Sequence, residues 1–185
     1  DVKLGPDGAI YIADWYNPII QHGEVDFRDP RRDRTHGRIW RVTYRGNPVV
    51  PREDLTQLST TALIERLASE NHWTRHMAKR VLKERGPEVL PAVKSWARSL
   101  DNTAAGYHRL RPEPLWVYLA LDTDEPELLQ TLLECKDASA RAAATRIAGE
   151  RFPERADWLQ ARIADEHPRV RLEAVRALAN SPDPQ

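Results

Sequence analysis

Hydrophobic and polar positions follow two different periods along the chain. Residues 1 to about 50 read in period two and hold five of the eight glycines. Residues 55–180 are rich in Ala, Leu, Glu and Arg, with apolar residues at helical spacing. The change falls near the stretch RGNPVVPRED. The pattern therefore predicts a β segment over residues 1–50 and a helical domain over residues 55–185.

The first segment contains two β-rich runs. In LGPDGAIYIAD a Pro-Asp-Gly turn precedes the first run, and Gly8 can take the positive φ that such turns require. In GRIWRVTYRG, alternation places Ile39, Arg41 and Thr43 on one side and Trp40, Val42 and Tyr44 on the other. An isolated two-stranded hairpin is marginally stable in water. We therefore expect these strands to belong to a larger sheet whose other strands lie outside this chain.

The helical segment contains an internal repeat. An Arg, an Ala three residues later and an Arg two residues further recur as Arg75-Ala78-Arg80, Arg141-Ala144-Arg146 and Arg171-Ala174-Arg176. We expect one repeat between the first and the second to have lost this signature. The apolar stripes predict eight helices in four pairs, that is, a short α-solenoid in which neighbouring pairs bury one another's apolar face. The stripes include Ala78, Val81 and Leu82, then Leu129, Leu132 and Leu133, and then Trp158, Leu159 and Ile163.

Two stretches resemble known families. The stretch EHPRVRLEAVRALA, residues 166–179, resembles the second helix of HEAT-like repeats. The stretch GPDGAIYIADWYNPIIQH, followed by RDPRRDRTHGRIWRVTYRG, resembles the last β-propeller blade of the PVC-type haem-binding proteins, a family of membrane-bound dehydrogenases. LWVYLALD, after a loop that contains a His, is similar to that family as well. The fold expected is mainly α: a short α-solenoid of HEAT-like helix pairs preceded by a small β segment that is the remnant of a propeller blade.

The second resemblance carries further implications. In that family a propeller similar to quinoprotein sugar dehydrogenases runs into HEAT-like repeats and often into a c-type cytochrome domain. It implies a periplasmic or extracytoplasmic parent protein, in which PQQ and c-type haem are the expected cofactors and this fragment alone is inactive. The implied partners are the other propeller blades and a cytochrome c domain or another protein. The haem-attachment motif Cys-x-x-Cys-His is absent here.

Composition narrows the alternatives. The 28 basic and 28 acidic residues give a formal net charge of zero, so no global field attracts nucleic acid or an anionic membrane. No apolar run is long enough for a membrane helix. The start, DVKLGPDGAI, lacks an initiating Met and a signal-peptide pattern, so we expect a fragment or a trimmed chain. The single cysteine, Cys135, excludes an internal disulfide and a Cys-based zinc site, and we expect it to be a small buried hydrophobic residue.

The stretch DWYNPIIQH holds the first candidate site. Asp14 ends a predicted strand and, with His22 and His36, is a candidate for catalysis. The candidates for substrate binding are Trp15, Tyr16, Asn17 and Arg38. Each has a structural alternative: Asp14 can cap the following turn, the aromatics can fill the space between blades, and either histidine can be hydrogen-bonded within a loop. No metal site is expected.

Arginines and aspartates interleave in FRDPRRDRTHGR, the next part of this loop. Arginine forks bind carboxylates in bidentate geometry, so Asp–Arg pairs can order the loop without a ligand. The arginines disfavour a calcium site, whereas a phosphate or acidic-sugar site stays open.

Candidate interaction residues lie in the helical segment. They are the recurrent Arg75, Arg141 and Arg171, together with Tyr107, His108 and Arg111 in the loop DNTAAGYHRLRPEP. The arginines could form a basic stripe, or could pair with a carboxylate or a helix C-terminus in the adjacent repeat. The loop could reach a partner or serve only as a linker between repeats.

Three hypotheses for function follow. The chain is the C-terminal part of an extracytoplasmic, propeller-type sugar or polyol dehydrogenase, with its repeats as scaffold or docking surface. Alternatively, it is a stand-alone HEAT-repeat module for protein–protein interaction. A HEAT-like DNA-binding or DNA-repair protein is the least favoured, because the net charge is zero and acidic residues interleave with the arginines.

Overall fold

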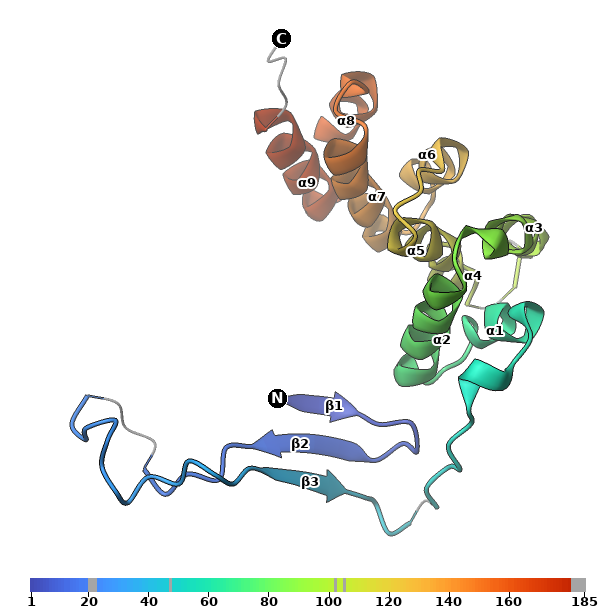
Figure 1. The fold of residues 1–185 in the computed structure, drawn as a ribbon. Coiled ribbons are helices and arrows are strands. Elements are labelled where there is room, and N and C mark those ends of the chain that lie inside the picture. The colour runs from blue at the N-terminus through green and yellow to red at the C-terminus, as the bar shows by residue number, and fades with distance from the viewer. Residues whose placement is uncertain (20–22, 47, 102, 105, 181–185) are drawn as a thin grey trace.

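A three-stranded sheet precedes an arc of helices in the computed structural model, which describes residues 1–19, 23–46, 48–101, 103–104 and 106–180 (Figure 1). The sheet lies at the N-terminal end of the arc, below α1 and α2 in Figure 1. The strands are β1 (Val2–Leu4), β2 (Ile10–Asp14) and β3 (Arg38–Val42), paired antiparallel in the order β1-β2-β3. The backbone N–H of Val50 donates to the carbonyl of Asp7, which ties the exit from the sheet to its first turn.

The turn between β1 and β2 has the predicted chemistry. Gly8 has φ +79°, a conformation that costs glycine little because it has no Cβ. The Asp7 carboxylate accepts a hydrogen bond from the backbone N–H of Ala9 at 3.1 Å and one from the Tyr11 hydroxyl at 3.1 Å. Arg41 of β3 donates to the same carboxylate. The Arg41 hydrogen bonds hold the pKa of Asp7 below its usual value, so one ionised carboxylate joins the turn to two strands.

One face of the sheet is apolar and uncovered. The register pairs Ile12 with Val2 and Trp40, and Ile10 with Leu4 and Val42, so these six side chains share a face. Trp40 and Val42 are each 49% exposed, and Val2 is 61% exposed. The opposite face carries Lys3, Tyr11, Ile39 and Arg41. The alternation predicted from the sequence is therefore present.

Capping side chains or prolines mark the starts of several helices. The elements are η1 (Leu55–Gln57), α1 (Thr60–Arg66), α2 (His72–Arg85), η2 (Pro87–Val89), α3 (Leu90–Ser99), α4 (Tyr107–Leu110), α5 (Glu113–Ala120), α6 (Pro126–Leu133), α7 (Ala138–Arg151), α8 (Ala156–Ile163) and α9 (Pro168–Ala179). Side chains of Ser59, Asn71 and Asp137 accept hydrogen bonds from first-turn N–H groups of α1, α2 and α7. Pro126 and Pro168 are the first residues of their helices, where a missing N–H has no cost.

The long helices pair as α1/α2, α3/α5, α6/α7 and α8/α9, and the four pairs follow one another along the arc. Figure 1 shows α2, α5, α7 and α9 on the inside of the arc and their partners on the outside. The prediction of eight helices in four pairs is confirmed for the described residues, and α4 adds one short turn within the loop between α3 and α5. The pair without the arginine signature is α3/α5.

Two apolar clusters fill the stack. Leu63, Leu82 and Val93 are buried in the first, between α1, α2, α3 and α5. Leu129, Ala144 and Leu159 are buried in the second, between α5 and α8. The prediction for Ile163 is wrong, because its side chain is 44% exposed. It is the last residue of α8, at the end of the stack, where no further helix of the described residues covers it. None of the helices in the described part of the chain is long and apolar enough to cross a membrane.

Candidate functional site

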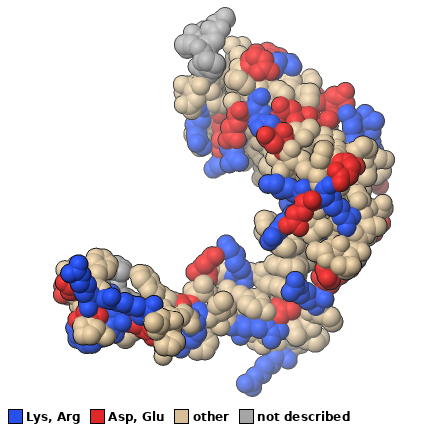
Figure 2. All heavy atoms as spheres, in the orientation of Figure 1, with Lys and Arg blue, Asp and Glu red and all other residues tan. Residues whose placement is uncertain are grey.

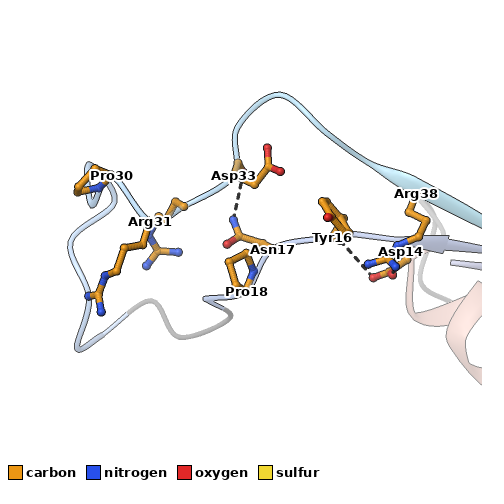
Figure 3. Close-up of a pocket in the computed structure, with 9 residues that line it drawn as sticks. Asp14, Tyr16, Asn17, Pro18, Pro30, Arg31, Asp33 and Arg38 are labelled. Carbon is orange, nitrogen blue, oxygen red and sulfur yellow. Dashed lines mark hydrogen bonds and ion pairs between the residues drawn. The ribbon is translucent and has the colours of Figure 1, made fainter.

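A hollow of about 580 Å³ opens where β2 passes into the long loop (Figure 3). Four of the residues predicted from the sequence line it together: Asp14, Tyr16, Asn17 and Arg38. Pro18, Pro30, Arg31, Arg32 and Asp33 complete the lining. The long loop therefore folds back on itself and brings residues about twenty positions apart against the end of the sheet.

Asp14 is held by three donors. Its carboxylate accepts from the backbone N–H of Tyr16 at 3.2 Å and from the Trp40 indole N–H at 3.0 Å, and Arg38 Nε lies 3.2 Å away. These contacts, the Trp40 hydrogen bond foremost, lower the pKa of Asp14 below its usual value. A lowered pKa disfavours a role as general base near neutral pH. The hydrogen bond from the Tyr16 N–H caps the turn after β2, which is the structural role considered for Asp14 as the alternative to catalysis.

Tyr16 and Asn17 shape the loop. Tyr16 has φ +53°, which is unfavourable for a residue with a Cβ. The Arg38 guanidinium lies 4.2 Å from the centre of the Tyr16 ring and 4.8 Å from that of Trp40, a cation–π arrangement. Asn17 donates from Nδ2 to the carbonyl of Asp33 at 3.3 Å and accepts from the N–H of Ile19. The two halves of the loop are thus joined across the hollow.

The loop arginines are engaged within the loop. Arg31 donates to both carboxylate oxygens of Asp29 at 2.9 and 2.8 Å. These hydrogen bonds lower the pKa of Asp29 to about 2. Arg32 donates to the carbonyls of Val25 and Asp26, and Arg34 to that of Phe27. This pattern agrees with a loop ordered by its own ion pairs and hydrogen bonds.

The remaining candidates of the loop do not line the hollow. His36 Nδ1 lies 2.9 Å from Asp33 Oδ2, with its side chain 68% exposed. Trp15 is 64% exposed and is not among the lining residues. His22 lies outside the described residues, so its position relative to His36 is not described. Within the described ranges, no group of three or more His, Cys, Asp or Glu is placed to hold a metal ion. The hollow is lined by charged side chains of both signs and by the ring of Tyr16.

The first arginine of each repeat signature makes the same contact in all three repeats. Its Nη1 donates to the carbonyls six and five residues earlier, in the turn that follows the preceding helix. Arg75 donates to Ser69 and Glu70 at 2.7 and 3.0 Å. Arg141 donates to Cys135 and Lys136 at 2.9 and 2.8 Å, and Arg171 to Asp165 and Glu166 at 2.8 and 2.9 Å. These bonds tie the turn between two helices to the first turn of the second helix. We call these three residues the latch arginines.

Two latch arginines also reach the next repeat. Arg141 donates to both carboxylate oxygens of Asp165 at 3.0 and 2.9 Å. Arg75 Nε lies 3.6 Å from the carboxylate of Glu113, which accepts from Lys79 at 2.7 Å as well. Such contacts favour the structural interpretation, in which these arginines join successive helix pairs.

The loop candidates pack locally. Arg111 donates to the carbonyl of Thr131 at 2.6 Å, and its guanidinium lies 5.6 Å from the centre of the Tyr107 ring. His108 contacts the same ring edge-on. Cys135 is buried as predicted, and burial raises the pKa of its thiol.

Sequence reasoning overlooked the second arginine of each signature. Arg80, Arg146 and Arg176 have side chains that are 63%, 56% and 64% exposed. Five residues correspond to about 140° of rotation around a helix, so the second arginine points away from the contact that the first one makes. The five-residue spacing could therefore have predicted that the second arginine of each signature is exposed. Arg146 and Arg176 border a groove on the inside of the arc.

The groove lies across α5, α7 and α9. Its main part, about 380 Å³, is lined by Trp116, Ser139, Ala142, Ala143, Arg146, Arg169 and Glu173. A smaller part of about 110 Å³ shares Arg146 and Glu173 and adds Gly149, Glu150, Arg176, Ala177 and Asn180. Figure 2 shows basic and acidic side chains interleaved along this inner edge of the arc.

Two family models match parts of the chain. The sequence model for HEAT repeats matches residues 125–185, which include α6 to α9. A domain of unknown function (DUF7133) matches residues 1–46, which include the sheet and the loop with its hollow. No curated protein and no solved structure matches the chain. The helical stack is therefore similar to HEAT repeats in its C-terminal half.

Proposed function

We propose that this chain is a protein-interaction scaffold whose stacked helix pairs present their inner helices to a protein partner. The observation that supports this function best is the match to HEAT repeats over the two helix pairs that carry the groove. A solenoid exposes a continuous surface along its inner helices, because each repeat contacts only its neighbours. Arg75 and Arg141 join successive helix pairs, and the inner surface is left for recognition.

Photo-crosslinking tests this proposal. Benzoyl-phenylalanine replaces Ser139, an exposed residue of the groove, or Gln160, an exposed residue of the outer helix α8. Both variants are incubated with an extract of the cells that carry the gene. We expect discrete protein adducts from position 139 and none from position 160. An absence of adducts at both positions, or the same adducts at both, would contradict an inner binding surface.

The uncovered face of the sheet favours a second, finer proposal: the chain is the C-terminal part of an extracytoplasmic propeller-type sugar or polyol dehydrogenase. A three-stranded sheet with six apolar side chains on one open face is suited to being covered by another sheet. In a propeller, neighbouring blades supply that cover. The HEAT-like pairs would then hold a cytochrome c domain or another protein against the catalytic part.

The residues of this chain do not fit a covalently attached haem. Attachment of c-type haem needs two cysteines and a histidine in one motif, and the sequence has Cys135 alone. Haem, or a quinone such as PQQ, would therefore be held by other parts of the parent protein. Within this chain, Asp14 and Arg38 would contribute to the surface that faces the missing blades.

The gene sequence upstream of residue 1 tests the second proposal. We expect a signal peptide and further strand-rich repeats with Pro-Asp-Gly turns. An open reading frame that begins near residue 1 would exclude the dehydrogenase parent and leave the scaffold proposal intact.

A further inference from the structure

The groove on α5, α7 and α9 holds a nearly buried carboxylate between two exposed arginines. Arg169 and Arg176 are seven residues apart on α9, so their positions lie about 10 Å apart on one side of the helix. Glu173 lies between them, and its side chain is only 3% exposed. Its carboxylate pairs with Arg169 at 2.9 Å and with Arg176 at 3.4 Å.

The buried carboxylate orients the two guanidinium groups without using up their donors. An arginine side chain has five N–H donors. Those of Arg141 are engaged by two backbone carbonyls and two carboxylates. Within the described residues, the ion pairs of the Arg169 and Arg176 side chains are those with Glu173. Their side chains are 61% and 64% exposed. Most of their donors therefore face solvent along the groove.

The floor and the neighbouring helices complete the groove. Ser139, Ala142 and Ala143 of α7 are small, which lets a main chain approach closely. Arg146 lies beside them and pairs with Glu150 at 3.4 Å. Trp116 of α5 lies at the side of the groove and is partly buried. Three arginines against two glutamates leave one net positive charge within reach of a bound chain.

We propose that this groove binds an extended acidic segment of a protein partner, with the partner's carboxylates on Arg146, Arg169 and Arg176 and an apolar side chain against Trp116. The inference rests on the proposed scaffold function and specifies the chemistry of its partner. Alternate side chains of an extended segment project to one side about 7 Å apart, so two or three acidic residues at alternate positions can reach the arginines. Arginine forks pair with carboxylates in this way.

A peptide is favoured over nucleic acid by the acidic residues of the same groove. Every nucleotide carries a phosphate, so a nucleic acid would place several of them near the carboxylates of Glu150 and Glu173, whereas a peptide with acidic residues at alternate positions can place uncharged side chains there. The chain as a whole has a net charge of zero, so it lacks the excess of positive charge on which nucleic-acid affinity depends.

Fluorescence anisotropy tests the proposal with the full chain. The probe is a fluorescein-labelled nonapeptide with Asp at alternate positions and Leu or Phe between them, and the reference peptide has Asn in place of each Asp. We expect the acidic peptide to bind at least tenfold more tightly than the reference. The double variant Arg146→Gln/Arg176→Gln should weaken binding of the acidic peptide at least fivefold, because both side chains are exposed and both face the groove.

The matched control is Arg80→Gln/Arg98→Gln, which removes the same charge from exposed positions of α2 and α3. It should change the affinity less than twofold, and thermal melting should show both double variants folded. Equal losses in the two double variants, equal affinity for the two peptides, or full displacement by a duplex oligonucleotide at the same concentration would overturn the proposal. If no peptide binds but adducts still form at position 139, the scaffold function stands and only the acidic partner is wrong.

Discussion

Arg141 and Asp165 form a nearly buried ion pair between the third and fourth helix pairs. Their side chains are 7% and 6% exposed. Arg141 also closes the turn before its own helix through the carbonyls of Cys135 and Lys136. One side chain therefore fixes both the start of α7 and the position of the next repeat.

Arg141→Ala should destabilise the chain more than Arg146→Ala, although the two residues lie on one helix. Loss of Arg141 leaves the Asp165 carboxylate without its main partner, so we expect the free energy of unfolding to fall by about 2–3 kcal/mol. The loss is not larger because water reaches the pair beside the exposed Glu166. Arg146 is exposed, so its removal should change stability by about 0.5 kcal/mol at most. Urea unfolding measures both. Equal losses would show that Arg141 is not a latch.

The lowered pKa of Asp165 should make the stability of the chain depend on pH in the acid range. The hydrogen bonds from Arg141, more than any other contact, lower the pKa of Asp165 in the folded chain. A lowered folded pKa stabilises the fold above the unfolded value, about 3.9. This contribution is lost as the pH falls through the folded pKa. Asp165→Asn should therefore be less stable than wild type at neutral pH, with the difference shrinking below about pH 4. A constant difference across the acid range, measured by urea unfolding, would contradict this.

At the scale of elements, a glycine lets α7 and α9 pack closely against each other. A Cβ placed on Gly149 would lie 2.3 Å from the Cβ of Ala177. The glycine is helical and has no positive φ. Its role is therefore to admit the neighbouring helix.

Gly149→Ala should destabilise the chain, although alanine favours helix by about 1 kcal/mol over glycine. Overpacking at a close crossing costs about 1–3 kcal/mol, so we expect a net loss of about 1 kcal/mol. Adding Ala177→Gly should recover part of the loss in a double-mutant cycle. Gly37→Ala, where the added Cβ meets nothing within 4 Å, is the control. Thermal melting that ranks Gly149→Ala at or above wild type would show that α7 and α9 can move apart.

At the scale of the whole molecule, charge is balanced and locally paired. Basic and acidic side chains interleave over the arc and the long loop (Figure 2). The latch arginines, which could have formed a basic stripe, are engaged with backbone carbonyls. Their side chains are therefore not free to form a basic stripe along the arc.

We expect no salt-dependent binding of this chain to duplex DNA. A protein that neutralises several phosphates loses affinity steeply as salt rises, and balanced charge leaves little such attraction. An electrophoretic mobility-shift titration with a short duplex at low and physiological salt measures this. Retention that falls steeply with salt would revive the DNA-binding hypothesis.

Much of the helical architecture was predictable from the sequence. Ala78, Ala144 and Ala174 of the repeat signature are all 0% exposed, because the spacing of small and apolar residues within a helix directly reports which face is buried. Pairing into four repeats followed from the same local pattern. The strands were predictable for a similar reason, through their alternation and the turn at Gly8.

Tertiary structure decided which group each charged side chain meets. Arg141 and Arg146 are the same residue type five positions apart, but the turn before α7 and the next helix pair engage Arg141, whereas Arg146 is left in the groove. The hollow at Asp14 and Arg38 likewise depends on a loop that folds back through Asn17. The sequence by itself determined which faces of the helices and strands are buried, because the spacing of apolar residues is a property of a single element. Only the fold determined the candidate sites, because the partner of a charged side chain belongs to another element.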